Sequence, residues 1–406
     1  MKTKPFSAIR PAPEVVSRLA CVPYDVVDPA EAKALVADND VSFLHVSRPD
    51  VDLPDGTDIY SEAVYAQASK ALSSLMDRGA LFKDPDSSYY LYRQIMGKHS
   101  QIGIVACCHI DDYANDIIRR HEKTRQDKED DRTRHVLRSN ANTGPVFITY
   151  RDQKPIDAIV GDVVKTEPLY DFIADDGIRH TVWKVPGNGE NLKALFDKVP
   201  VSYIADGHHR AKAAYRAGME RRAANPAHTG NEEYNWFLAV LFPASQLRIL
   251  PYNRCVNGLN GLSPKAFLGK VSQVFQVCKT ENPVPAGERH ANMYLDGSWY
   301  ALSWPPFEAD PVASLDVSVL QERLLAPILG IVDPRTDKRI SFVGGIRGPK
   351  ELKRRVDSGR DTVAFSMAPV TVNQMIAIAD AGQIMPPKST WFEPKLRSGL
   401  FVHEII

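Results

Sequence analysis

One stretch decides the fold at the centre of this chain: Val201-Ser-Tyr-Ile-Ala-Asp-Gly-His-His-Arg-Ala-Lys-Ala-Ala-Tyr215. A short apolar strand leads through Gly207 into a helix that opens with two imidazoles and the guanidinium of Arg210. Unpaired N–H groups at a helix start attract anions, Gly207 lacks a Cβ that would block their approach, and Arg210 offers a planar fork of donors. The pattern predicts an anion site. Alternatively, Asp206 only caps the helix and the histidines face solvent.

Length and charge set the first limits on what the protein does. The chain has 406 residues, enough for about two or three domains. Its 50 basic side chains balance its 50 acidic ones, so no overall field draws it to a nucleic acid or a membrane. Five cysteines without a Cys-x-x-Cys pair are typical of reduced thiols, and no apolar run approaches the ~18 residues of a membrane span. We expect a cytoplasmic monomer or small homo-oligomer.

The order of apolar patterns predicts a mixed α/β (α+β) fold, with a central region that carries the anion site and further α+β regions at both ends. Prolines are dispersed, so no linker marks the boundaries. We expect four segments, at 1–110, 111–255, 256–345 and 346–406.

Several elements are predicted within these segments. Strands that could share one sheet are expected at 89–94, 102–107, 145–150, 201–206 and 236–242, with a helix at 60–75 that stops at Gly79. Further along, we expect a hairpin at 293–300, a strand at 362–365, and helices at 314–329, 349–357 and 372–381.

The densest charge lies in the polar run from Arg119 to Arg132, between apolar strands. If the run is helical, His121, Arg125 and Lys128 share one face. A solvated, salt-bridged helix is the alternative interpretation. If the run instead folds over the helix start at Gly207, it brings several cations toward one anion. Glu122 would then be a candidate general base or metal-holding carboxylate.

Two other segments carry candidate binding residues. In Met385-Pro-Pro-Lys-Ser-Thr the prolines stiffen the chain and present Lys388 and Ser389, although a simple turn is the alternative. In Val22-Pro-Tyr-Asp an extended bend precedes Tyr24 and Asp25, and Asp25 could recognise a substrate amine or belong to a buried turn.

The common nucleotide cradles are missing from the sequence. It holds no Gly-x-x-x-x-Gly-Lys-Ser/Thr loop, no Gly-x-Gly-x-x-Gly after a strand, no kinase-like His-Arg-Asp set, and no Gly-x-Ser-x-Gly elbow. A phosphate site without an evident adenine-binding module favours a small, highly charged ligand.

The segment Tyr203-Ile-Ala-Asp-Gly-His-His-Arg resembles the phosphate-binding motif of the ParB/sulfiredoxin superfamily. The resemblance implies a ParB/sulfiredoxin-like phosphate-binding core at 111–255. The whole chain is similar to a long family, formerly an uncharacterised-domain group, associated with free L-serine kinases, including pyrophosphate-dependent forms. Six blocks carry this resemblance: Val22-Pro-Tyr-Asp, Ser42-Phe-Leu-His-Val-Ser-Arg-Pro, Arg120-His-Glu-Lys-Thr-Arg, Lys128-Glu-Asp-Asp-Arg, Asn142-Thr-Gly-Pro-Val-Phe and Met385-Pro-Pro-Lys-Ser-Thr. The chain lacks the helix-turn-helix region of ParB itself, which argues against DNA binding.

The resemblance implies a kinase of serine metabolism and cysteine biosynthesis that transfers a phosphoryl group from pyrophosphate to L-serine with Mg²⁺. Alternatives are an ATP- or ADP-dependent serine kinase, and a non-catalytic phosphate- or nucleotide-binding regulator. Catalytic roles are expected for Glu122, Asp206 and His209, with Glu122 and Asp206 also holding the metal. Phosphate binding is expected from Gly207, His208, Arg210, His121, Lys123, Thr124, Arg125, Lys128, Lys388 and Ser389. Substrate contacts are expected from Tyr24, Asp25 and His45.

Overall fold

The computed structural model describes residues 1–187, 189–306 and 310–406. The chain divides into two compact units. Unit 1 comprises Met1–Leu247 and Pro394–Ile406, and unit 2 comprises Arg248–Glu393. The fold is mixed α/β, as expected from the order of apolar patterns.

The units group the segments expected from the sequence differently. Segment 1–110 and nearly all of 111–255 fall in unit 1, where they share one sheet. Segment 256–345 lies in unit 2. Segment 346–406 is split, because its last residues from Pro394 onward return to unit 1.

A nine-stranded sheet forms the centre of unit 1. Its order is β6-β11-β8-β12-β5-β4-β10-β9, with β1 added beside β5. Two pairs are parallel, β11 with β6 and β12 with β8, and the other pairs are antiparallel. The strands are β1 Thr3–Lys4, β4 Tyr90–Met96, β5 His99–His109, β6 Ile118–Arg119, β8 Val146–Tyr150, β9 Tyr170–Ile173, β10 Arg179–Lys184, β11 Ser202–Asp206 and β12 Trp236–Pro243.

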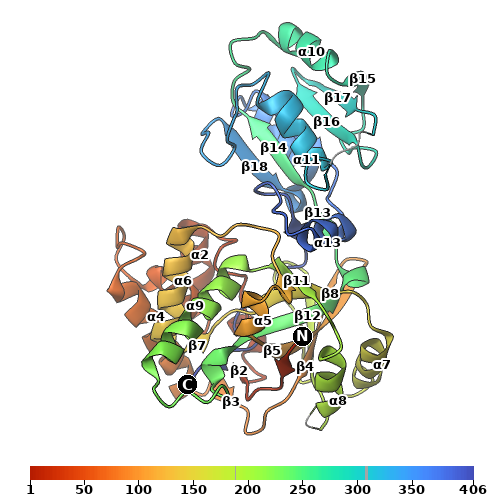
Figure 1. Ribbon diagram of the computed structural model, residues 1–406. Helices are drawn as coiled ribbons and strands as arrows, with labels where there is room; N and C mark the ends of the chain where they lie inside the picture. The colour runs from red at the N-terminus through yellow and green to blue at the C-terminus, as the bar shows by residue number, and fades with distance from the viewer. Residues whose placement is uncertain (188, 307–309) are drawn as a thin grey trace. The chain divides into compact units, whose positions relative to one another are not determined.

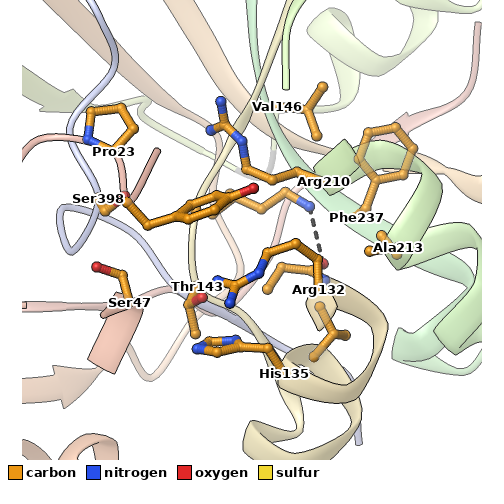
Figure 2. Close-up of a pocket in the computed structure, with 16 residues that line it drawn as sticks. Pro23, Ser47, Arg132, His135, Thr143, Val146, Arg210, Ala213, Phe237 and Ser398 are labelled. Atoms are coloured by element: carbon orange, nitrogen blue, oxygen red, sulfur yellow. Dashed lines mark hydrogen bonds between the residues drawn. The ribbon is translucent and has the colours of Figure 1, made fainter. Parts of the chain in front are cut away.

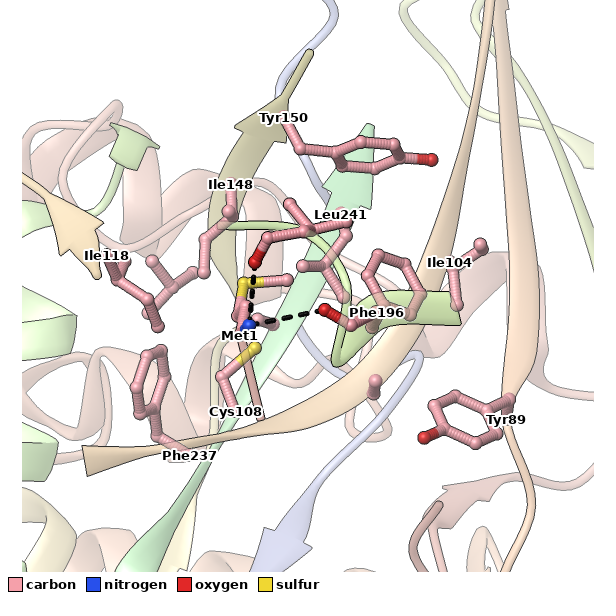
Figure 3. Close-up of a cluster of buried hydrophobic side chains, with 14 of the residues drawn as sticks. Met1, Tyr89, Ile104, Cys108, Ile118, Ile148, Tyr150, Phe196, Phe237 and Leu241 are labelled. Atoms are coloured by element: carbon pink, nitrogen blue, oxygen red, sulfur yellow. Dashed lines mark hydrogen bonds between the residues drawn. The ribbon is translucent and has the colours of Figure 1, made fainter. Parts of the chain in front are cut away.

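One face of this sheet carries the main hydrophobic core (Figure 3). Alternate residues of β5 and β12, among them Ile104, Cys108 and Leu241, point into it, as the two-residue period of a strand requires. Phe196 and the side chain of Met1 complete the cluster, and the amino group of Met1 donates hydrogen bonds to the carbonyls of Phe196 (3.2 Å) and Val199 (2.7 Å). This packing supports the sheet to which β11 belongs.

Helices surround the sheet, and α4, α6 and α9 lie side by side in Figure 1. The helices of unit 1 are α1 Val16–Leu19, α2 Pro29–Val36, α3 Leu44–Ser47, α4 Glu62–Asp77, α5 Ile110–Ala114, α6 Gln126–Ser139, α7 Lys154–Val163, α8 Glu190–Phe196 and α9 His208–Ala224. Two small ribbons complete the unit: β2 Ile9–Pro11 with β3 Leu81–Lys83, and β7 Ala141–Asn142 with β21 His403–Glu404. The pairing of β21 with β7 fastens the returning C-terminal segment to this unit.

Unit 2 is built on a six-stranded antiparallel sheet. Its strands, in spatial order, are β15 Gln276–Thr280, β17 Ser298–Ser303, β16 His290–Leu295, β19 Val363–Met367, β14 Tyr252–Val256 and β18 Ile340–Gly344. A separate ribbon pairs β13 Ile249–Leu250 with β20 Trp391–Phe392, and the helices are α10 Pro264–Ser272, α11 Asp316–Leu320, α12 Gly348–Asp357 and α13 Val372–Asp380.

Most elements expected from the sequence are present within a few residues of their expected bounds. The clearest difference is the helix expected at 314–329, where α11 ends at Leu320 and a π-helical turn follows at Gln321–Leu325. Among the residues described, no helix has both the length and the apolar character needed to cross a membrane.

Candidate functional site

The strand, glycine and helix predicted around Gly207 are all present. β11 ends at Asp206, Gly207 adopts φ 91° and ψ 33°, and α9 begins at His208 without a side-chain cap. A Cβ on Gly207 would lie 2.9 Å from three atoms of the Arg210 guanidinium. The glycine therefore makes room for Arg210 as well as allowing the left-handed turn, whereas the sequence interpretation assigned that room to an anion.

Asp206 sits between two cations. Its Oδ2 accepts a hydrogen bond from Nη2 of Arg210 at 2.7 Å, and its Oδ1 accepts one from Nζ of Lys395 at 2.8 Å. Burial alone would raise the pKa of Asp206, but Lys395 and Arg210 outweigh it and hold that pKa well below its usual range. Because both oxygens are engaged, the geometry favours a role for Asp206 in orienting these cations over a role as base or metal ligand.

The polar run meets the start of α9, as the sequence hypothesis required. Oε2 of Glu122 lies 3.7 Å from Nδ1 of His208. The rings of His121 and His208 pack edge to face with centroids 4.5 Å apart, and the backbone N–H of Arg125 donates to Nε2 of His209 at 3.1 Å. Two segments more than 80 residues apart thus build one site.

The local structure of this run differs from the helical alternative. Residues 120–125 form an irregular loop, and α6 starts only at Gln126. His121, Arg125 and Lys128 consequently do not share a helix face. The loop conformation is what lets the rings of His121 and His208 and the carboxylate of Glu122 meet.

The histidines of the site are neutral at physiological pH. Burial lowers the pKa of His208 to about 3, against a smaller opposing effect of Asp206. Burial likewise lowers the pKa of His121 to about 3 and, to a smaller extent, the pKa of His209. These rings offer hydrogen bonds rather than positive charge. The positive charge of the site therefore comes from arginine and lysine side chains, among them Arg210 and Lys395.

Two buried nitrogens at the start of α9 are available to a ligand. Nε2 of His208 and Nε of Arg210 are buried and have no hydrogen-bond partner in the part of the chain that the structure describes. A buried polar atom without a partner costs free energy, so a ligand or water that pairs with these atoms would be stabilised there. Both atoms lie next to the helix start that attracts anions.

The remaining residues predicted to bind phosphate are differently engaged. Lys123 is exposed, the hydroxyl of Thr124 donates to Glu129, and Lys128 donates to the hydroxyl of Tyr60 at 3.2 Å. Arg125 forms an exposed ion pair with Asp127 at 2.7 Å. Of these side chains, Lys123 can reach a ligand without giving up an internal contact.

Lys388 and Ser389 belong to unit 2, where the loop that carries them is anchored locally. The Oγ of Ser389 donates to the carbonyl of Pro386 at 2.6 Å. The carbonyl of Lys388 accepts a hydrogen bond from Arg254 at 3.2 Å, and Nζ of Lys388 lies 5.5 Å from the ring centre of Tyr252. Their part in phosphate binding stays a prediction.

The predicted substrate residues separate into two groups. The charge of Asp25, which is exposed, acts on the titration of His209, so Asp25 lies near the start of α9. Tyr24 lines a cavity in unit 1. His45, on α3, bonds to the carboxylate of Asp52 at 2.7 Å and to the carbonyl of Asn39 at 3.1 Å, so both its ring nitrogens are engaged outside this cavity.

That cavity lies against Arg210 and has about 30 Å³ of water-accessible volume (Figure 2). Its polar lining includes Arg132 and His135 from α6, together with Thr143 and Ser398. Sequence reasoning assigned no role to these four residues. The available signal was the three-residue spacing of Arg132 and His135, which puts both on one face of a helix.

Mg²⁺ was expected at Asp206 and Glu122. Among the described residues, no three side chains of metal-ligating type gather in one place. Glu122, whose side chain is 34% exposed, fits a Mg²⁺ ion that is held mostly by phosphate oxygens. Asp206 does not fit while its two oxygens bond Arg210 and Lys395.

Comparison with known proteins gives a family and several distant structural likenesses. A conserved hypothetical protein from Pyrococcus furiosus aligns at 13% identity over 74% of this chain and 95% of its own, with a TM-score of 0.36. A free serine kinase in complex with AMP aligns at 11% identity over 73% and 91%, with a TM-score of 0.38. SbnI with a C-terminal truncation, from Staphylococcus aureus, aligns at 10% identity over 74% and 87%, also at 0.38.

Likenesses at these values carry no argument about the activity of this chain. No curated protein matches it. Residues 3–318 match the family described as "Protein of unknown function (DUF1015)", and because this match spans more than half of the sequence, the chain belongs to the DUF1015 family.

Proposed function

We propose that this protein is a phosphotransferase that moves a phosphoryl group from pyrophosphate to the hydroxyl of free L-serine. The observation that carries the proposal is the approach of Glu122 to His208 at the uncapped start of α9, beside Arg210. It combines a carboxylate able to accept a proton with a site that attracts anions. The resemblance of the six sequence blocks to serine kinases suggests the acceptor and the donor.

The start of α9 would hold the phosphoryl group that is transferred. Its backbone N–H groups and the Nε–H of Arg210 supply hydrogen bonds, and Nε2 of His208 adds one in the neutral tautomer that carries the proton on that nitrogen. Asp206 holds Arg210 and Lys395 in place before the donor arrives. Phosphoryl transfer asks a protein mainly for such alignment and charge stabilisation.

Glu122 is the better of the two candidate bases, because Asp206 is locked between cations that favour its ionised, hydrogen-bonded state. In the proposed reaction the serine hydroxyl oxygen bonds to the phosphorus of pyrophosphate while the bond from that phosphorus to the bridging oxygen breaks. The hydroxyl proton passes to the carboxylate of Glu122, and orthophosphate leaves. The products are O-phospho-L-serine and orthophosphate.

A Mg²⁺ ion would be held chiefly by the donor's own oxygens, with Glu122 as the carboxylate available to join them. When bound, it neutralises negative charge on the phosphates. The protein side chains position the donor and acceptor around it.

The test is the variant Glu122→Gln, which keeps the size of the side chain but removes the proton acceptor. We expect turnover to fall by about 10²- to 10⁴-fold, the usual contribution of a general base. Pyrophosphate binding, measured by calorimetric titration, should stay within about twofold because the anion site is intact. Glu220→Gln on the exposed face of α9 is the matched control and should retain full activity.

Wild-type turnover in Glu122→Gln would remove Glu122 as the base. Pyrophosphate binding without O-phosphoserine formation by the wild-type protein would contradict the enzyme proposal and favour the regulator instead.

A further inference from the structure

The cavity beside Arg210 has a chemistry that the phosphoryl site does not account for. It is lined by the guanidinium-bearing side chains of Arg132 and Arg210, and Figure 2 shows the guanidinium of Arg132 beside Thr143, with His135 below it in the view. We infer that this cavity binds the carboxylate of the acceptor amino acid, with Arg132 as the main donor. The inference rests on the proposed function and names the determinant of its acceptor class.

Arg132 is held with its donor fork free. Its Nε donates to Asp131 at 2.8 Å, and its guanidinium stacks over the ring of Tyr24 at 4.3 Å. The two terminal nitrogens have no hydrogen-bond partner among the residues that the structure describes, although only 12% of the side chain is exposed. A buried guanidinium normally uses its fork, so this one is prepared for a planar anion.

The charge around the cavity also suits an anion. Two guanidinium groups line the cavity, those of Arg132 and Arg210, and no carboxylate of the described residues does. Their carboxylate partners, Asp131 and Asp206, lie outside that lining. A carboxylate on the ligand can bind in the bidentate geometry that an arginine fork prefers.

The size of the cavity selects a small group. Its water-accessible volume of about 30 Å³ corresponds to roughly two water molecules. A carboxylate displaces about that much water. The hydroxyls of Thr143 and Ser398 supply polar contacts at the wall, whereas the N–H of the neutral His135 ring is already donated to the carbonyl of Val46.

The position of Arg210 links this cavity to the phosphoryl site. The same side chain lines the cavity and bonds Asp206 at the start of α9. An amino acid with its carboxylate on Arg132 would therefore lie next to the donor, and the exposed Asp25 near His209 is available to its ammonium. The acceptor class is a small α-amino acid with a side-chain hydroxyl.

The test compares Arg132→Met and Arg132→Lys with the control Arg134→Met, an exposed arginine on the same helix. Steady-state phosphorylation is measured with L-serine and with ethanolamine, which lacks the carboxylate. In Arg132→Met we expect the KM for L-serine to rise by at least about tenfold, because a charge-assisted bidentate contact is lost. The KM for pyrophosphate should change less than about twofold, and the preference for L-serine over ethanolamine should collapse. The KM of Arg132→Lys for L-serine should lie between the values of Arg132→Met and the wild type, and the KM of Arg134→Met should match the wild type.

If the Arg132→Met variant is active and its KM for L-serine is unchanged, the inference is overturned and the proposed function still stands. If the wild-type protein phosphorylates L-serine with none of the donors tested, the proposed function fails. Thermal shifts with L-serine and L-alanine then decide the inference separately. A shift in the wild type that Arg132→Met loses supports a carboxylate site, and its absence from the wild type refutes one. If Arg132→Met does not fold, Thr143→Val gives the same readout from the cavity wall, with an expected rise in KM for L-serine and refutation if that KM is unchanged.

Discussion

The substitution Gly207→Ala tests two roles of this glycine: it adopts a left-handed backbone conformation, and it leaves room for the side chain of Arg210. Gly207 has φ 91°, a conformation that costs any residue with a Cβ about 1–2 kcal/mol. The new Cβ would also lie 2.9 Å from Cζ, Nε and Nη2 of Arg210, so the guanidinium must shift and strain its bond to Asp206. Gly56 provides the matched control, because its φ is 84° and a Cβ there meets nothing within 4 Å.

The expected magnitudes follow from this difference. Gly56→Ala should lower the free energy of unfolding by about 1 kcal/mol, since the left-handed strain is partly offset by a less flexible unfolded chain. Gly207→Ala adds an overpacking cost and should lower it by about 3 kcal/mol in total. At about 2–4 °C per kcal/mol, the unfolding temperature should fall by about 2–4 °C for Gly56→Ala and about 6–12 °C for Gly207→Ala.

Thermal unfolding followed by fluorescence, with and without pyrophosphate, measures both effects. Gly207→Ala should also lose most of the stabilisation that pyrophosphate gives the wild type, whereas Gly56→Ala should keep it. Equal losses of stability in the two variants, with the pyrophosphate shift intact in both, would refute the claim that Gly207 makes room for Arg210.

Two further predictions concern charge. Asp206→Asn leaves Arg210 and Lys395 without the carboxylate between them and should lower the free energy of unfolding by about 3 kcal/mol. Asp127→Asn, in an exposed ion pair, should shift the unfolding temperature much less, and equal shifts in the two variants would contradict this. Burial lowers the pKa of His208, His121 and His180 to about 3 and the pKa of His135 to about 4. In the unfolded chain these histidines have their ordinary pKa near 6.5. Between about pH 6.5 and 4 the unfolded chain therefore binds protons that the folded chain does not. Stability should therefore fall as pH drops from about 6.5 toward 4, and an unfolding temperature that stays constant from pH 7 to 5 would be inconsistent with neutral buried histidines.

Local chemistry made the start of α9 predictable from sequence. An apolar strand, a glycine that can take positive φ and a basic helix start lie within a few residues, and all three are found. The sequence hypothesis required the polar run to fold over the start of α9, and in the structure Glu122 does approach His208 there. The loop at 120–125 was not predictable from local sequence, because its contacts, such as the packing of the His121 ring on His208, join segments far apart in the chain.

Residues missed by sequence reasoning owe their roles to tertiary contacts. Lys395 reaches Asp206 across 189 positions, and nothing near Lys395 in the chain marks it as a partner. Arg132 is placed at the cavity by tertiary contacts, among them Tyr24, which comes from a distant segment and covers one face of the guanidinium. The division into units was equally hidden, since the chain returns to unit 1 at Pro394 without a linker signal.

The central claim is phosphoryl transfer to serine, and phosphorus NMR tests it most directly. Purified protein is incubated with L-serine, Mg²⁺ and one donor at a time: pyrophosphate, ATP or ADP. The account predicts matched signals of O-phosphoserine and orthophosphate with pyrophosphate, and their loss when EDTA replaces Mg²⁺. If O-phosphoserine forms only with a nucleotide, the phosphoryl donor is that nucleotide and not pyrophosphate. The absence of O-phosphoserine with every donor would contradict the account.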